Sequence, residues 1–201
     1  MDNIKFSSIL CSQICHDLAG SIGVIDNTLD LINPEDLTSF PKDDYHFVSK
    51  AAKQAIIQIK FIRTVFGNSS NSILFNEAFE LSKLYLGLKK IQLFWNNDSV
   101  TKEIEAKLIM SILYGSKIIL PYGGSIKILQ KNSSDFEIKL KGEKVIYFEN
   151  IIPLLNSKSS VDLGNSKFLP FMYAGLLSKE KQFNFNQSIA EDKITYIAYR
   201  N

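Results

Sequence analysis

Two adjacent residues near the start of the chain, His16 and Asp17, have the side chains needed for nucleophilic chemistry. A neutral imidazole nitrogen is a nucleophile, and an exposed histidine is mostly neutral at pH 7. A carboxylate beside it can accept a hydrogen bond from one ring nitrogen, which fixes the tautomer, leaves the other lone pair free and stabilises the developing cation. Attack on an acyl phosphate suits such a nitrogen, because phosphoryl transfer depends mainly on in-line positioning and charge neutralisation. The pair is equally compatible with an ordinary solvated histidine.

The segment around this pair, from about residue 4 to residue 32, is predicted to be one helix. Its apolar residues follow an unbroken 4-3-4-3-4-3 spacing, typical of a seam that faces a partner helix; they are Cys11, Cys15, Leu18, Ile22, Ile25, Leu29 and Ile32. At about 100° per residue, His16 lies on the opposite side of the helix and points outward. The two cysteines are interpreted as packing residues of the seam.

Small side chains surround His16 on its face of the helix, where Lys, Glu and Gln are usual. Two of them are glycines, which cost up to about 1 kcal/mol each relative to alanine in a helix. A cleared face around a protruding imidazole suits close approach by a partner protein. The residues predicted to dock this partner on the first helix are Ser12, Ala19, Gly20, Gly23 and Asn27.

A second helix is predicted from about residue 44 to residue 66. Its apolar residues again step by four and three; they are Val48, Ala52, Ala55, Ile59, Ile62 and Phe66. Two such helices joined by a short loop predict an antiparallel helical hairpin. Further apolar positions widen each stripe beyond one partner, so we expect a homodimer whose two hairpins form a four-helix bundle. This first domain is assigned to residues 1–67.

The polar segment from Gly67 to Ser72 is interpreted as a linker, and a second domain is assigned to residues 73–201. Helices are predicted at 77–89, 101–120 and 167–179. Strands are predicted at 90–95, 124–131, 135–142, 143–149, 181–187 and 193–200. The mixture indicates a sheet covered by helices on one side, so the fold class of the whole chain is predicted to be α+β.

Composition narrows the classes of function. The net charge is +2, with 23 Lys and Arg interspersed among 21 Asp and Glu, so nothing indicates a nucleic-acid partner. Two cysteines and two histidines do not complete a zinc site. The N-terminus does not resemble a signal peptide, and no apolar run approaches the ~18 residues of a membrane span. We therefore expect a reduced cytoplasmic protein with no bound metal, no cofactor and no membrane partner.

The segment CHDLAGSIGVIDNTLDLI resembles the phosphoacceptor helix of sensor-kinase dimerisation and histidine-phosphotransfer domains, and most closely that of the ChpT-type histidine phosphotransferases of alphaproteobacteria. AAKQAIIQIKFIRTVFG resembles the second helix of that family, and FIRTVFG is its specific part. AKLIMSILYGSKIILPYGGSIKI and KFLPFMYAGLLSK resemble later parts of the family, mainly in their apolar patterns. The resemblance implies a dimeric four-helix bundle followed by an α/β sandwich like a histidine-kinase ATP-binding domain that has lost ATP.

By this resemblance His16 is the phosphorylated histidine and Asp17 is its acidic neighbour. Phosphoryl groups are expected to pass from the receiver domain of a CckA-like hybrid kinase to CtrA-like and CpdR-like response regulators, which govern the cell cycle. The magnesium that this transfer needs is expected on the receiver. Where many kinases carry Thr or Asn to orient a hydrolytic water, this chain has Gly20, so we expect poor phosphatase activity. Ser21 replaces a frequent proline, so the helix should bend less there.

The second domain does not have the motifs of a working kinase. KLIMSILYGSKIIL has no Asn or carboxylate for a magnesium ion, and both Asp162-Leu163-Gly164 and Tyr122-Gly123-Gly124 are interpreted as turns. The domain is therefore predicted to be a scaffold or docking platform. Arg63, which matches the family pattern, is a candidate for contacting an acidic receiver surface or an ordinary solvated arginine. Two alternatives remain open: an ATP-dependent sensor-type kinase, and a dimeric protein that binds receivers without accepting phosphate.

Overall fold

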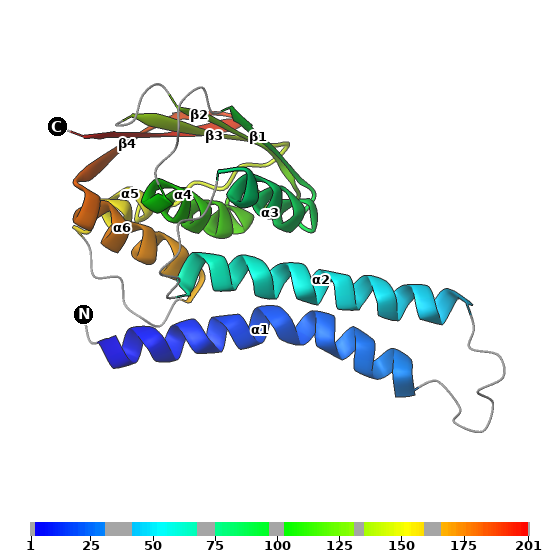
Figure 1. Cartoon of the computed structure of the whole chain (residues 1–201). Coiled ribbons are helices and arrows are strands. Elements are labelled where there is room, and N and C mark those ends of the chain that lie inside the picture. Colours follow the sequence, from blue (N-terminus) through cyan, green and yellow to red (C-terminus); the bar gives the residue numbers. More distant parts are fainter. Residues whose placement is uncertain are drawn as a thin grey trace.

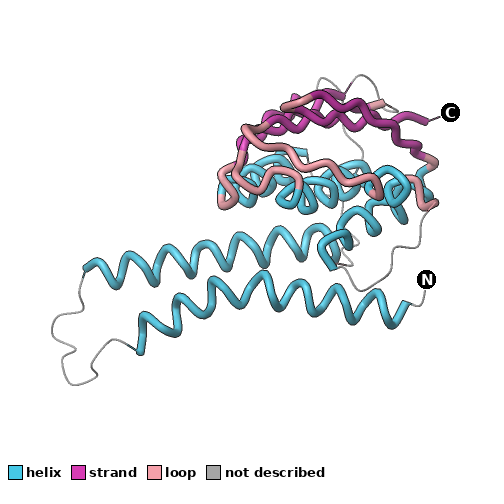
Figure 2. The backbone as a smooth tube through the Cα atoms, turned by 180° about the vertical axis from the view of Figure 1, so that it is seen from behind, coloured by secondary structure: helices cyan, strands magenta, loops and turns pink. Residues whose placement is uncertain are grey.

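Two long helices and an α/β domain make up the computed structural model, which describes residues 3–30, 42–67, 75–96, 103–130, 135–158 and 166–200. Helix α1 spans Asn3–Asp30 and helix α2 spans Lys42–Phe66. They lie side by side beneath the α/β domain (Figure 1), and Figure 2 shows the same arrangement from behind. Both helices were predicted, although residues 31–32 and the predicted linker after Gly67 lie outside the described residues. The division at residues 67 and 73 stays a prediction.

A five-stranded mixed sheet forms the upper layer of the α/β domain. Its strands lie in the order β1-β2-β3-β5-β4, with β1 and β2 parallel and the other neighbours antiparallel. The strands are β1 Ile91–Asn96, β2 Gly124–Gln130, β3 Phe136–Lys141, β4 Phe183–Ala190 and β5 Lys193–Arg200.

The helices of this domain cover one face of the sheet, as the sequence predicted (Figure 1). They are α3 Phe75–Gly87, α4 Glu103–Gly115, α5 Ile151–Leu155 and α6 Leu169–Lys181. Short 3-10 helices at Ser116–Ile118 and Ser166–Phe168 follow α4 and precede α6. Every described side chain of α4 except that of Lys107 is buried. The sheet covers one side of this helix, and helices α2, α3 and α6 contact its other sides. An almost wholly apolar sequence therefore suits this helix.

One predicted strand and one predicted helix end differ from the structure. Residues 143–149 form a bend, an irregular stretch and a turn, and they do not join the sheet, in which β2 and β5 already pair with the two sides of β3. Ile146 instead donates its backbone N–H to Ile119 at 2.9 Å. The helix predicted over 101–120 changes to a 3-10 turn after Gly115, where a Cβ atom would lie 2.5 Å from the ring of Phe171.

The apolar seam predicted on the first helix is only partly packed in this chain. Leu18 and Ile25 are half-buried against the rest of the protein, whereas four other members of the seam are exposed: Cys11, Cys15, Ile22 and Leu29. Within the single chain these four do not face a partner helix, and the expectation that the seam does so in a dimer stays a prediction. The orientation of α1 about its own axis explains this exposure. The side of α1 that carries Gln13 and Asp17 faces the rest of the protein, and the centre of the seam does not.

Helix α1 also bears on the expectation that no segment resembles a membrane span. Among the described residues, the stretch Phe6–Asp30 is long and apolar enough to cross a membrane by length and composition, so that expectation was too strong. One such helix is weak evidence, and α1 contacts α2 and the α/β domain.

Candidate functional site

Asp17 on α1 is held by two side chains from the α/β domain. The hydroxyl of Tyr114 donates a 2.5 Å hydrogen bond to Oδ2 of Asp17, and the ammonium of Lys117 forms a hydrogen-bonded ion pair with the same oxygen. Tyr114 lies in the last turn of α4 and Lys117 in the 3-10 turn that follows. These contacts join parts of the chain about 100 positions apart.

The other carboxylate oxygen of Asp17 faces its own helix. Gln13 donates a 2.9 Å hydrogen bond to Oδ1, and Nδ1 of His16 lies 3.5 Å from the same atom. The second distance is long for a hydrogen bond but places Nδ1, rather than Nε2, beside the carboxylate. The His16 side chain is 84% exposed, whereas that of Asp17 is 16% exposed. The site is thus a half-buried acid beside a protruding imidazole.

The charge of Asp17 is stabilised despite its burial. Burial alone would raise the pKa of the carboxyl, but hydrogen bonds from Lys117 and Tyr114 and the positive charge of Lys117 hold that pKa below its ordinary value. The pKa of Lys117 is also lowered, because its burial outweighs the attraction of Asp17 and nearby Lys89 adds repulsion. The two partners shift in the same direction because several donors converge on Asp17, whereas Lys117 gains one carboxylate.

A stack of aromatic rings fixes the position of Tyr114. The rings of Phe61 and Tyr85 stack with their centroids 4.1 Å apart, and Tyr114 lies 5.7 Å from Tyr85 and 5.7 Å from Phe66. The Lys117 ammonium lies 4.6 Å from the centroid of the Tyr114 ring. Burial raises the pKa of Tyr114 well above its ordinary value, and its hydrogen bond to Asp17 adds to the rise. The phenol therefore stays protonated and donates a hydrogen bond to Asp17 from a fixed position.

The predicted docking face around His16 is open in the structure. Ser12, Ala19, Gly20 and Asn27 are exposed and Gly23 is half-buried. A Cβ atom added at either glycine would meet nothing within 4 Å, so neither glycine is required by packing within this chain.

Arg63 is not brought together with His16. It is exposed near the end of α2 and lines the groove between α1 and α2 beside Leu10, Ile14 and Leu18. At about 100° per residue, Ile14 and Leu18 lie on the opposite side of α1 from His16. A role for Arg63 in receiver docking stays a prediction.

Sequence reasoning missed Tyr114 and Lys117. Both stand in the segment KLIMSILYGSKIIL, which attracted attention only because it offers no metal ligand. A signal was present, since a lysine three residues after a tyrosine at the end of an otherwise apolar helix requires a partner for its charge. The partner is on another element, and single-sequence periodicity does not reveal such a pairing.

The glycine pair Gly123-Gly124, which could suggest a phosphate-binding loop, has a structural role in the turn before β2. Gly123 and Gly124 have φ angles of +91° and +145°, and a Cβ atom would lie 2.5 Å from the Lys90 carbonyl at the first and 2.3 Å from the Lys141 carbonyl at the second. They form the predicted helix-to-strand turn. Residues 161–165, with Asp162-Leu163-Gly164, lie outside the described residues.

Helices α4 and α6 pack directly against each other. Ser111 donates a 2.7 Å hydrogen bond to the Pro170 carbonyl, and the ring of Phe171 lies against Gly115. Aromatic and backbone atoms therefore fill the space between these helices. Among the described residues, no group of three or more His, Cys, Asp or Glu could hold a metal ion.

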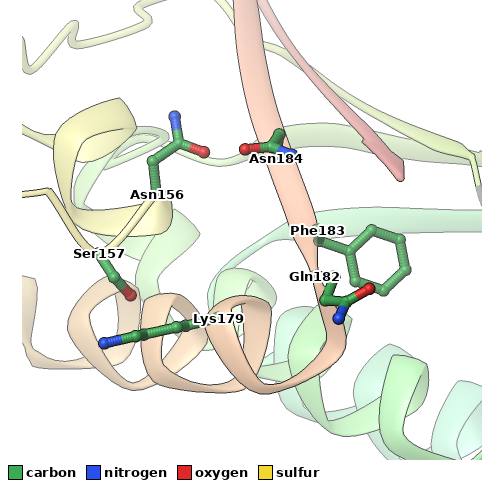
Figure 3. A pocket seen from close by; sticks show the side chains of 6 residues that line it. All are labelled: Asn156, Ser157, Lys179, Gln182, Phe183 and Asn184. Atoms are coloured by element: carbon green, nitrogen blue, oxygen red, sulfur yellow. The ribbon is translucent and has the colours of Figure 1, made fainter. Parts of the chain in front are cut away.

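A separate hollow lies where α5, α6 and β4 meet (Figure 3). Two of its polar side chains, Asn156 and Ser157, have structural partners. Asn156 exchanges two hydrogen bonds with the backbone of Phe185, at 2.9 and 2.7 Å, and Ser157 donates to the Gly175 carbonyl at 2.6 Å. These two residues join α5 to β4 and α6, so this part of the lining serves the fold.

The paired long helices, the exposed histidine and the α/β domain fit a class of proteins that transfer phosphoryl groups between protein partners. The chain belongs to the histidine phosphotransferase family, since the model of the histidine phosphotransferase C-terminal domain matches residues 75–193. It is similar to the protein phosphotransferase ChpT of Brucella abortus (strain 2308), with 26% identity over 146 residues that cover 69% of this chain and 68% of the relative.

The fold has a counterpart among solved structures. A bacterial phosphotransferase structure matches with a TM-score of 0.80 and 21% identity, covering 98% of this chain and 97% of that one. That likeness shows the fold. The family match and the similarity to ChpT identify the protein as a phosphorelay histidine phosphotransferase, whose activity is phosphoryl transfer between proteins.

Proposed function

We propose that His16 is the phosphoacceptor and that Asp17 orients it. The observation that supports this most directly is the combination of an 84% exposed imidazole with Nδ1 placed 3.5 Å from an oxygen of the half-buried Asp17 carboxylate. A proton shared between Nδ1 and Asp17 leaves the lone pair of Nε2 as the nucleophile. The open face of α1 around His16 gives a receiver room to approach.

The transfer proceeds in two reversible steps. The Nε2 lone pair attacks the phosphorus of an aspartyl phosphate on the donor receiver, a nitrogen–phosphorus bond forms, and the phosphorus–oxygen bond to the donor carboxylate breaks with its electron pair. Asp17 stabilises the positive imidazole ring that results. An acceptor carboxylate then attacks the same phosphorus and His16 leaves as a neutral imidazole. The receiver supplies magnesium and in-line geometry, so the chain itself needs no cofactor.

The partners follow from the resemblance to ChpT-type proteins. A CckA-like hybrid kinase receiver is proposed as donor, CtrA-like and CpdR-like regulators are proposed as acceptors, and control of the cell cycle is the proposed outcome. We also propose a cytoplasmic location. Cys11 and Cys15 are free and exposed, which suits a reducing compartment.

We further propose that α1 and α2 form a helical hairpin and that two hairpins make a dimeric four-helix bundle. Large apolar side chains remain exposed along both helices, including Ile22 at 52% and Leu29 at 48% on α1 and Ile56 at 51% and Ile59 at 46% on α2. The groove between α1 and α2 is lined mostly by apolar residues. A second copy of the chain, with the same seam, would cover this surface.

The decisive experiment follows labelled phosphate from a donor receiver to the protein and then to an acceptor. We expect His16→Gln to abolish acid-labile, alkali-stable label and to reduce transfer more than 100-fold. The matched control is His46→Gln, which changes the other histidine, exposed on α2, and should transfer at nearly the normal rate. Transfer that persists in His16→Gln would overturn the proposal, and label taken from ATP alone would favour a kinase.

A further inference from the structure

We propose that Lys117 and Tyr114 of the α/β domain are positioning residues for the phosphoacceptor, because they set the orientation and charge of Asp17 and thereby select the reactive tautomer of His16. This inference depends on the proposed role of His16. It gives the α/β domain a part in the reaction beyond that of a docking platform.

The two oxygens of Asp17 have different partners, and this difference fixes the orientation of the carboxylate. Oδ2 accepts hydrogen bonds from Tyr114 and Lys117, and Oδ1 faces Gln13 and His16. Two donors on one oxygen fix the plane of the carboxylate, and this plane presents the other oxygen to Nδ1. Gln13, on the same helix turn, assists but does not set the rotation, because Oδ2 is held from outside α1.

The balance of charge carries the second step. A bare carboxylate beside His16 would repel the phosphoryl group that the ring must accept. The ammonium of Lys117 is bonded directly to this carboxylate. The Lys117 side chain is only 20% exposed and that of Asp17 16%, so solvent screens the pair weakly. The other titratable groups acting on the pair are Lys89, which acts on Lys117, and Tyr85, whose pKa is raised by burial and by Asp17. The charge beside His16 is thus a carboxylate paired with an ammonium.

The local fold holds Lys117 in place. The backbone leaves α4 at Gly115 and forms a 3-10 turn, in which Ser116 donates its hydroxyl to the Leu113 carbonyl at 2.6 Å. The Lys117 ammonium lies over the Tyr114 ring, 4.6 Å from its centroid. A continuous helix would place residue 117 at a different angle, so the change to a 3-10 turn helps aim Lys117 at α1.

The test measures the tautomer of His16 separately from transfer. Ring-nitrogen NMR of the full-length protein reports which nitrogen carries the proton, and with two histidines in the chain His46 serves as the internal reference. Wild type should show the proton on Nδ1 of neutral His16. Lys117→Met and Tyr114→Phe should both shift the population toward the Nε2–H form. We expect Lys117→Met to lower the transfer rate about tenfold and Lys117→Arg to restore most of it.

Two controls make the test specific. Lys107→Met makes the same chemical change at a lysine on α4 that does not contact Asp17. Lys107 donates a 3.1 Å hydrogen bond to the Gly67 carbonyl instead. This variant should alter neither the tautomer of His16 nor the transfer rate. In an Asp17→Asn background, Lys117→Met should have no further effect on either.

The outcomes separate this inference from the proposed role of His16. If His16→Gln is inactive while Lys117→Met keeps both the wild-type tautomer and the wild-type rate, the positioning role is wrong and the phosphoacceptor stands. Equal losses in Lys107→Met and Lys117→Met would also overturn the positioning role, because both would then report loosened domain packing. Transfer by His16→Gln would remove the phosphoacceptor itself, whatever the tautomer measurements show.

Discussion

The Tyr114 hydroxyl lies 2.5 Å from Oδ2 of Asp17, and this hydrogen bond joins the α/β domain to the residue that follows His16. Asp17 therefore has two roles in one carboxylate, since one oxygen anchors the domain and the other faces the imidazole. A change in how the domain sits on α1 would change the surroundings of His16 as well. Stability and transfer are expected to be coupled at this residue.

The first prediction concerns the pH dependence of stability at Asp17. Because its folded pKa lies below the ordinary value, the ionised carboxylate stabilises the fold above its unfolded pKa of about 3.9. That stabilisation is lost as the pH falls through the lower folded pKa. Asp17→Asn should lower the free energy of unfolding by roughly 1–3 kcal/mol at pH 7, as for a hydrogen-bonded charged group.

Urea unfolding of wild type and Asp17→Asn from pH 7 to pH 3 measures this difference. The difference should stay constant down to about pH 5 and shrink below about pH 4. Asp26→Asn is a suitable control, since Asp26 is exposed on the same helix. A difference between wild type and Asp17→Asn that does not change with pH would contradict the prediction.

The second prediction sets stability against docking at the two helix glycines. Alanine at Gly20 or Gly23 meets no neighbouring atom, so each substitution should raise the free energy of unfolding by about 0.5–1 kcal/mol. If the open face serves receiver approach, the same substitutions should weaken receiver binding, with the larger effect at Gly20, four residues from His16. Thermal unfolding and titration with a receiver measure the two effects.

A stabilised variant that binds and transfers normally would mean that the glycines do not serve docking. Gly87→Ala is the comparison, because Gly87 ends α3 and also has open space around it. That substitution should change neither receiver binding nor transfer.

The sequence predicts the local parts of this site and misses the distant ones. Helical periodicity places His16 outward correctly, because the face of a helix depends on neighbours three and four residues away. Tyr114 and Lys117 meet Asp17 only through the packing of α4 against α2 and α1, and no short-range pattern encodes that contact.

The same distinction explains the errors in the fold. The segment 143–149 alternates like a strand, yet β3 has both of its edges paired, and pairing partners are a property of the whole sheet. Ile22 is exposed in the single chain because of the orientation of α1 about its axis. Contacts between α1 and the α/β domain determine that orientation.

The third prediction tests the dimer through the exposed seam. Glutamate at Ile22 or Ile59 would place a charge within the proposed bundle, where an unpaired carboxylate is strongly disfavoured. Wild type should sediment as a dimer at micromolar concentration, and each variant should sediment as a monomer with unchanged far-ultraviolet circular dichroism. Ile189→Glu, on the exposed part of β4, should leave the dimer intact. A monomeric wild type would end the proposal.

The fourth prediction concerns the closed packing of α4 against α6. A Cβ atom at residue 115 would lie 2.5 to 3.0 Å from three atoms of the Phe171 ring, and that ring is fully buried. Gly115→Ala should therefore lower the free energy of unfolding by about 1–3 kcal/mol, as overpacked cores do. Phe171→Leu alone should also destabilise the protein, because it leaves a cavity.

The double variant separates a specific contact from general damage. If the ring and the new methyl group compete for one space, Gly115→Ala with Phe171→Leu should be more stable than the sum of the single losses predicts, by at least about 0.5 kcal/mol in a double-mutant cycle. Additive losses would mean that Phe171 does not occupy the space beside residue 115.

Because Gly115 is also the last residue of α4 before the turn that carries Lys117, the single Gly115→Ala variant should shift the His16 tautomer as Lys117→Met does, and ring-nitrogen NMR measures that shift.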